Sequence, residues 1–143
     1  MSLEKVLLVD DEEDFVNALS ERLEARGLEV SKASNGKEAV DRSNKDKYDA
    51  VILDLQMPEM DGMETLKVLL KENPDMQIVL LTGHATVSKG IEAMKFGAMD
   101  FLEKPVDFDK LMNIIKEASA KKMILTEKKI QEELKNILTT RGW

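Results

Sequence analysis

The fold of this chain is most constrained by an alternation, repeated five times, between short apolar runs and helical patterns. The apolar runs are rich in valine, leucine and isoleucine, as expected of strands that are covered on both faces. Between the runs, apolar residues recur at helical spacing, for example at Phe15, Leu19 and Leu23. The pattern predicts strands at residues 5–10, 28–33, 49–54, 77–82 and 99–104, and helices at residues 13–26, 35–46, 62–73, 85–97 and from about residue 108 onward.

Five strand–helix units in a row indicate a parallel sheet with right-handed crossovers and helices on both faces. The run at 49–54 is the most apolar and is expected at the centre, whereas the run at 28–33 alternates and is expected near an edge. The predicted fold is therefore α/β, a doubly wound five-stranded parallel sheet. Ligands of such sheets bind beyond the carboxyl ends of the strands, so those ends are where a site is expected.

Composition limits the function classes. A chain of 143 residues that is 43% hydrophobic and 34% charged is typical of one soluble globular domain. The absence of cysteine excludes disulfides and thiolate metal sites and suits a cytoplasmic protein. A formal net charge of −7 argues against direct nucleic-acid binding. No apolar segment approaches the length of a membrane span, so we expect no membrane partner.

Charged and hydroxyl side chains stand at four of the five predicted strand ends, namely Asp10, Asp11, Asp54, Thr82 and Lys104. Three carboxylates at close quarters repel one another unless a cation offsets their charge, and an open site of oxygen ligands suits Mg²⁺. A carboxylate beside a metal can attack a phosphoryl group and form an acyl phosphate. Thr82 can donate to one phosphoryl oxygen and Lys104 can offset the charge on another. The sequence thus predicts phosphoryl transfer to the central carboxylate, Asp54.

Four stretches, in order and spacing, identify a resemblance that covers residues 4–118: "LLVDDEEDF", "VILDLQMPEMDG", "LLTGHA" and "GAMDFLEKP". Together they resemble the receiver domain of bacterial two-component response regulators. The last two stretches look most like receivers that precede ATPase-type transcription activators. The resemblance implies a flavodoxin-like fold with strand order 2-1-3-4-5, in which phosphorylation switches a signalling surface. It also implies a signalling domain, not an enzyme with a substrate of its own, which assists its own phosphotransfer and autodephosphorylation.

The resemblance also assigns roles to the residues at the strand ends. Asp54 would accept a phosphoryl group from a histidine of a sensor kinase. Asp11 and Asp54 would bind Mg²⁺ directly, Asp10 would act mainly through water, and the backbone carbonyl of Gln56 would be a further ligand. The side chains of Gln56 and His84 would face the attacking water and tune the lifetime of the acyl phosphate.

Two further residues are implied in the switch. Thr82 would move toward the phosphoryl group and Phe101 would turn inward to fill the space. The surface formed by the fourth helix, fifth strand and fifth helix would change shape and select an effector domain or protein, or pair with the same face of a second copy. Pro105 is a candidate for a cis peptide bond with Lys104, since X–Pro bonds adopt the cis form at modest cost.

Some of these residues also fit other interpretations. Asp10 and Asp11 are also the residues expected at a solvated helix N-terminus, where the helix dipole favours acids. A Mg²⁺-dependent phosphohydrolase also forms an aspartyl-phosphate. Such enzymes generally need a second acid two residues after the nucleophile, and Gln56 occupies that position and cannot donate a proton.

Residues 119–143 are expected to form a helical extension or linker, because the helical pattern continues past the end of the receiver resemblance. Its composition differs from that of the rest, with six Lys or Arg residues and three Glu. Met123, Ile130 and Ile137 recur at steps of seven, joined by Leu134 and Ile124, but Glu127 interrupts the seam. A coiled coil that makes a homodimer and a linker helix packed on its own domain both remain open. So do a fragment of a transcription regulator and a stand-alone receiver that binds another protein.

Overall fold

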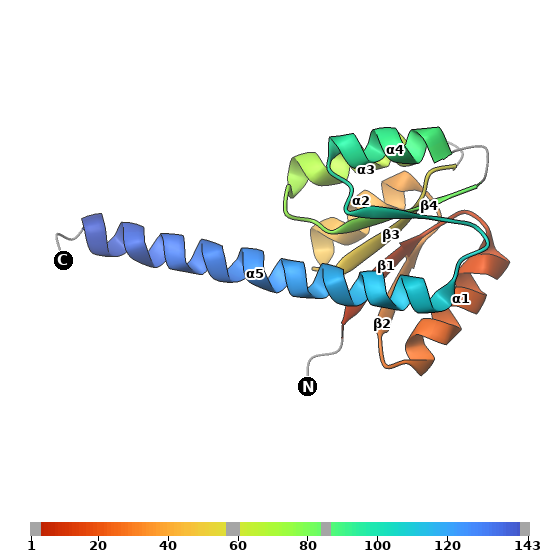
Figure 1. Cartoon of the computed structure of the whole chain (residues 1–143), viewed down its shortest axis with the longest axis horizontal. Helices are drawn as coiled ribbons and strands as arrows, with labels where there is room; N and C mark the ends of the chain where they lie inside the picture. Colours follow the sequence, from red (N-terminus) through yellow and green to blue (C-terminus); the bar gives the residue numbers. More distant parts are fainter. Residues whose placement is uncertain (1–3, 57–60, 84–86, 141–143) are drawn as a thin grey trace.

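The computed structural model describes residues 4–56, 61–83 and 87–140. Ten elements alternate along the chain (Figure 1): β1 (Lys5–Val9), α1 (Glu13–Ala25), β2 (Glu29–Ala33), α2 (Gly36–Lys45), β3 (Ala50–Asp54), α3 (Gly62–Glu72), β4 (Ile78–Thr82), α4 (Val87–Phe96), β5 (Asp100–Glu103) and α5 (Phe108–Thr140). The predicted sequence of strands and helices is confirmed, with the strand ends one residue shorter in several cases.

The five strands form one parallel sheet in the order β2-β1-β3-β4-β5. This confirms the doubly wound α/β fold, the central place of β3 and the edge position of β2. The reversal of strand order falls between β1 and β3, because the chain runs from β1 outward to β2 and then returns to the other side. Ligand sites of doubly wound sheets lie at such a reversal, beyond the carboxyl ends of the strands.

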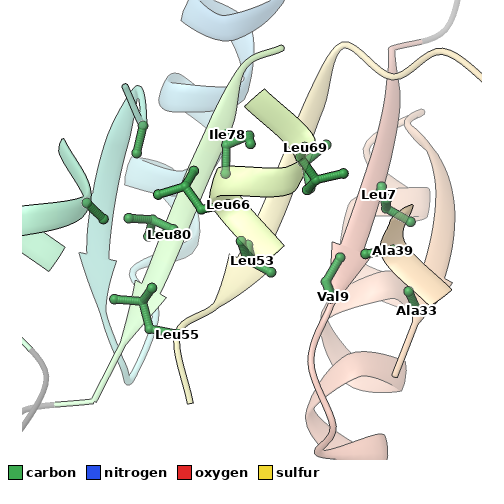
Figure 2. Packing of buried hydrophobic residues seen from close by; sticks show 13 residues of the cluster. Leu7, Val9, Ala33, Ala39, Leu53, Leu55, Leu66, Leu69, Ile78 and Leu80 are labelled. Atoms are coloured by element: carbon green, nitrogen blue, oxygen red, sulfur yellow. The ribbon is translucent and has the colours of Figure 1, made fainter. Parts of the chain in front are cut away.

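Two apolar clusters hold the helices on the sheet. Because successive side chains of a strand point to opposite faces, Leu7 and Val9 pack against one layer of helices while Val6 and Leu8 pack against the other. The first cluster includes residues of α2, α3 and α4, and Figure 2 shows its packing around Leu53, Leu66 and Leu80. The second joins α1 and the first part of α5 to the other face of the sheet. Both faces of the central strands are therefore covered.

Helix ends follow local chemistry. The side chain of Asn35 accepts from the backbone N–H of Glu38, so Asn35 caps α2. Asp61 caps α3 in the same way, accepting from the N–H of Glu64 at 2.8 Å. Helix α1 is followed by Gly27 at a φ of 89°, in the left-handed region where glycine ends helices at no steric cost.

Helix α5 is 33 residues long, about 50 Å, and runs past the edge of the domain (Figure 1). Its last buried residue is Ala118. Beyond that point the helix stays continuous, and a row of large apolar side chains is about half exposed or more: Met123, Ile124, Ile130, Leu134, Ile137 and Leu138. Among the described residues, none of the helices combines the length and the apolar character needed to cross a membrane.

Candidate functional site

The carboxyl ends of β1, β3 and β5 bring Asp10, Asp54 and Lys104 together. The ammonium nitrogen of Lys104 lies 2.9 Å from Oδ2 of Asp10 and 3.6 Å from Oδ2 of Asp54. Asp10 and Asp54 are 2% and 3% exposed, so both carboxylates are inside the protein. Residues 94 positions apart in sequence meet here only because parallel strands end at the same edge of the sheet.

Asp11 completes a cluster of three carboxylates. One oxygen from each of Asp10, Asp11 and Asp54 lies within 4.8 Å of the others. Unlike its two neighbours, Asp11 is exposed, so the cluster opens to solvent on one side. Three hard oxygen ligands around one point are a donor set that a divalent cation such as Mg²⁺ prefers. The residues present therefore fit a metal site.

Burial dominates the electrostatics of Asp54. Removal from water and the nearby charge of Asp10 raise the pKa of the Asp54 carboxyl to about 6, although the backbone N–H of Gln56 donates to its Oδ1 at 3.1 Å and opposes the rise. For Lys104, burial pushes the pKa down, but the hydrogen bond to Asp10 and the charges of Asp54 and Asp10 outweigh burial and raise the pKa. Lys104 is thus a firmly protonated cation beside a carboxylate that holds its proton more tightly than usual.

Thr82 is fully buried and is the last residue of β4, the strand beside the one that carries Asp54. Its hydroxyl donates to the carbonyl of Leu102 at 3.4 Å. Leu102 belongs to β5, which flanks β4 on the side away from β3. The hydroxyl is therefore directed away from the strand that carries Asp54. Phe101, on the same strand as Leu102, is half-buried. It packs against the apolar cluster that joins α2, α3 and α4 to the sheet.

The remaining predicted residues are placed as follows. Gln56 is exposed beyond the end of β3, and its Oε1 lies 3.7 Å from where a Cβ on Gly83 would be. Its side chain therefore reaches over the chain that leaves β4. The peptide bond between Lys104 and Pro105 is cis. His84 lies outside the described residues.

A model of the response regulator receiver domain family matches residues 6–116, most of the chain. The chain belongs to this family. The site just described stands within the matched residues, and the receiver domain of two-component response regulators is the domain that this sequence encodes.

Individual relatives agree. The transcriptional regulatory protein ZraR of Klebsiella oxytoca is 39% identical over 80% of this chain. A putative response regulator, NtrX-like, from Rickettsia bellii is 41% identical over 82% of it. The match spans only 26% and 25% of these two relatives, so the chain covers about a quarter of their length. This agrees with the resemblance to receivers that precede the other domains of transcription activators.

Solved structures confirm the fold. The crystal structure of a response regulator receiver domain protein from Clostridium thermocellum has a TM-score of 0.81 and 37% identity to this chain. The match covers 86% of this chain and 99% of the Clostridium thermocellum chain. The agreement extends over a whole receiver domain.

Sequence reasoning missed two side chains that contact Lys104. Oε1 of Glu12 lies 3.4 Å from its ammonium nitrogen, and the ring centroid of Phe15 lies 4.6 Å from the same atom. A cation over an aromatic face is attracted to it. The stretch "DDEEDF" contained both residues, but only the fold shows that the start of α1 lies over the end of β5.

Gly62, the first residue of α3, lies very close to the backbone at the end of β3. A Cβ on Gly62 would lie 2.4 Å from Cα of Leu55 and 2.6 Å from the carbonyl oxygen of Asp54. No side chain fits there, since real Cβ contacts do not fall so short. The missing side chain lets α3 begin directly against the backbone that carries Asp54, and the N–H of Gly62 donates to the carbonyl of Leu55 at 3.3 Å.

Proposed function

We propose that Asp54 accepts a phosphoryl group from a phosphohistidine of a sensor histidine kinase and that this switches the receiver. The observation that carries the proposal is the convergence of Asp10, Asp11, Asp54 and Lys104 on one edge of the sheet. Asp54 is the acceptor because it ends the central strand, between the other two acids and the cation.

The acidic cluster would hold Mg²⁺. Asp11 and Asp54 would be direct ligands, the carbonyl of Gln56 a third, and Asp10 would act mainly through water. When bound, Mg²⁺ supplies positive charge that offsets the carboxylates and the incoming phosphoryl oxygens. It would also keep Asp54 ionised, which matters because burial and Asp10 raise the pKa of this carboxyl to about 6.

The transfer step needs no reactant beyond the carboxylate of Asp54 and the phosphohistidine donor. An oxygen of the Asp54 carboxylate forms a bond to phosphorus while the bond from phosphorus to the donor's imidazole nitrogen breaks. The imidazole leaves with the electron pair and takes up a proton. Lys104 would offset charge on a phosphoryl oxygen, for which it has to release part of its bond to Asp10. In a separate hydrolysis step, a water oxygen would bond to phosphorus while the bond from phosphorus to the Asp54 oxygen breaks, which frees the carboxylate and releases inorganic phosphate. Gln56 and His84 would set the rate of this autodephosphorylation.

A groove of about 480 Å³ beside the site offers a place for the phosphodonor to dock. It lies between α1 and the chain that joins β5 to α5, and Lys104 stands at its edge. It is mainly apolar, and Arg22 lies over the ring of Phe108 at 4.1 Å, which fixes one wall. The groove is lined by Phe15, Ala18, Leu19, Arg22, Lys104, Pro105, Val106 and Phe108. A helical partner bound here would present a histidine to Asp54.

The output runs through the face made by α4, β5 and α5, where Thr82 and Phe101 would rearrange together. We propose transcription regulation as the output, since the chain matches about a quarter of the length of relatives such as the transcriptional regulatory protein ZraR. A stand-alone receiver that binds another protein is the alternative. In either case the receiver domain would act in the cytoplasm and would not itself bind nucleic acid or a membrane.

Residues 4–118 would form the receiver and residues 119–143 an extension that pairs two copies. Along α5 the positions of Ala120, Met123, Glu127, Ile130, Leu134 and Ile137 alternate in steps of three and four, the spacing of a coiled-coil seam. On another side of the helix, Lys122 pairs with Asp49 at 3.5 Å and Lys129 pairs with Asp75. Packing on its own domain and pairing with a second copy would thus use different sides of α5. The ion pairs to the domain leave the apolar side available for a second copy.

The proposal is tested by incubating the protein with Mg²⁺ and a small phosphoramidate donor and measuring the intact mass. The wild type is expected to gain one phosphoryl group, and Asp54→Asn none. Equal labelling of the variant would overturn the assignment of Asp54. The remote alternative, a phosphohydrolase, requires continuous turnover of phosphate esters, which a separate incubation with Mg²⁺ and a small phosphate ester would reveal as released phosphate.

A further inference from the structure

Gly90 lies within α4 and is buried against Thr82 of β4 and Phe101 of β5. A Cβ atom built on its backbone would lie 3.3 Å from Cγ2 of Thr82 and 3.3 Å from Cδ2 of Phe101. Carbon atoms pack best at about 3.5–4.0 Å. The missing side chain is thus what lets α4 lie this close to both residues of the proposed switch.

Local preference does not explain a glycine at this position. Glycine is less favourable than alanine in the interior of a helix, because it loses more backbone entropy on folding. Gly90 is not at a helix end, and its φ is not in the left-handed region that requires glycine. The contact with Thr82 and Phe101 is the physical reason that the structure offers.

The methyl and hydroxyl groups of Thr82 are linked by one torsion. In this arrangement the hydroxyl donates to the carbonyl of Leu102 while the methyl faces Gly90. A threonine side chain occupies three staggered positions, so any rotation that takes the hydroxyl away from Leu102 also takes the methyl away from Gly90. Whether the methyl rests on α4 therefore reports where the hydroxyl points.

We propose that Gly90 is a positioning residue that favours the resting arrangement of the receiver, by giving the Thr82 methyl room to rest on α4. The inference rests on the proposed function, in which the Thr82 hydroxyl turns toward a phosphoryl group on Asp54. A side chain at position 90 crowds the resting arrangement and leaves the turned one, whose methyl has moved, less affected. Gly90 thereby sets how readily α4 and the switch pair leave the resting state.

The test is a titration of Gly90→Ala with beryllofluoride, which mimics a phosphoryl group on a carboxylate, in saturating Mg²⁺. Fluorine NMR of the bound species measures occupancy directly. Since the ligand binds the turned arrangement, Gly90→Ala is expected to bind about threefold more tightly than the wild type. Ser88→Ala, an exposed change on the same helix, serves as the matched control and is expected to leave the affinity unchanged.

A second background isolates the methyl contact. Thr82→Ser keeps the hydroxyl and removes Cγ2, so adding Gly90→Ala to it should change the affinity by less than it does in the wild type, because only the contact with Phe101 then remains. Unchanged or weaker binding by Gly90→Ala, or equal tightening in the serine background, would overturn the proposal. A merely structural role would move the urea midpoint without moving the affinity. If Gly90→Ala did not fold, Thr82→Ser alone would test the same contact from the other side and is also expected to bind more tightly. A wild type that binds no beryllofluoride would instead refute the proposed function.

Discussion

The ammonium nitrogen of Lys104 lies 2.9 Å from Oδ2 of Asp10, and this contact joins the loop after β5 to the end of β1. Both groups are largely withdrawn from water, with the Asp10 side chain fully buried and that of Lys104 21% exposed. A buried ion pair contributes little net stability, but removing one partner leaves the other charge uncompensated. Lys104 is therefore both the cation that the acidic cluster needs at rest and the cation that a phosphoryl group would claim.

Replacing Lys104 by methionine is expected to destabilise the metal-free protein at neutral pH by about 1–3 kcal/mol, because Asp10 and Asp54 lose their partner. Urea unfolding measures the change. Lys116→Met, an exposed change on α5, is the control and should lie within about 0.5 kcal/mol of the wild type. The loss should be smaller in an Asp54→Asn background, since one of the two buried charges is then absent. Equal losses in both backgrounds would mean that the charge of Asp54 contributes nothing to the stabilising effect of Lys104.

The raised pKa of Asp54, about 6 against an ordinary value of 3.8, predicts a pH dependence of stability. Because the folded protein holds this proton more tightly than the unfolded chain, the free energy of unfolding falls as pH rises from about 4 to about 6. Asp54→Asn removes that loss and should be more stable than the wild type above pH 6, by about 2–3 kcal/mol without metal.

Urea unfolding at several pH values between 4 and 8, in chelator, checks this prediction. The difference between the two proteins should shrink toward zero at the acid end, where the carboxyl of Asp54 is protonated in both states. A difference that is independent of pH would show that the Asn side chain stabilises for another reason.

Metal binding should distinguish two exposed acids near the start of α1. Asp11 belongs to the carboxylate cluster and Asp14 does not, although both are exposed. Asp11→Asn is expected to weaken Mg²⁺ binding by about tenfold or more, and Asp14→Asn to change it little. Isothermal titration calorimetry with Mg²⁺ measures both affinities. Similar losses for the two variants would indicate a diffuse charge effect instead of coordination.

Much of the fold could be predicted because strands buried on both faces consist of consecutive apolar residues, as in residues 49–54. Polar residues then show where these strands end. The strand order came only from the family resemblance, since sequence periodicity does not say which strands are neighbours. Glu12 and Phe15 escaped prediction for a related reason. Their contacts with Lys104 depend on how α1 lies over the loop after β5, and no pattern in the chain encodes that distance.

The contacts of the α5 extension could not be predicted from the sequence either. Its heptad-like spacing left pairing with a second copy and packing on its own domain open. The structure adds ion pairs of Lys122 and Lys129 to the domain, yet it leaves Ile130 and Leu134 half exposed on another side. The helix therefore does both jobs in our proposal, which a sequence of apolar steps alone could not separate.

Self-association through α5 predicts that the molar mass of the wild type rises toward that of a dimer when Mg²⁺ and beryllofluoride are added. Leu134→Lys should keep the protein monomeric, because it places a charge in the apolar seam. Glu132→Lys adds the same residue away from the seam and is the control. Light scattering gives the masses. A rise in molar mass that also occurs in Asp54→Asn would show that self-association does not depend on phosphorylation of Asp54. A wild type that stays monomeric would favour a different protein as the partner of the receiver.

In our proposal Asp54, and no other acid of the cluster, carries the phosphoryl group. Borohydride reduces an aspartyl phosphate to homoserine, so treating the phosphorylated protein with borohydride and mapping its peptides by mass spectrometry locates the acceptor directly. We expect homoserine at position 54, formed only when Mg²⁺ and the phosphodonor are both present. Homoserine at position 10 or 11, or none at all from a protein that binds Mg²⁺, would contradict this proposal.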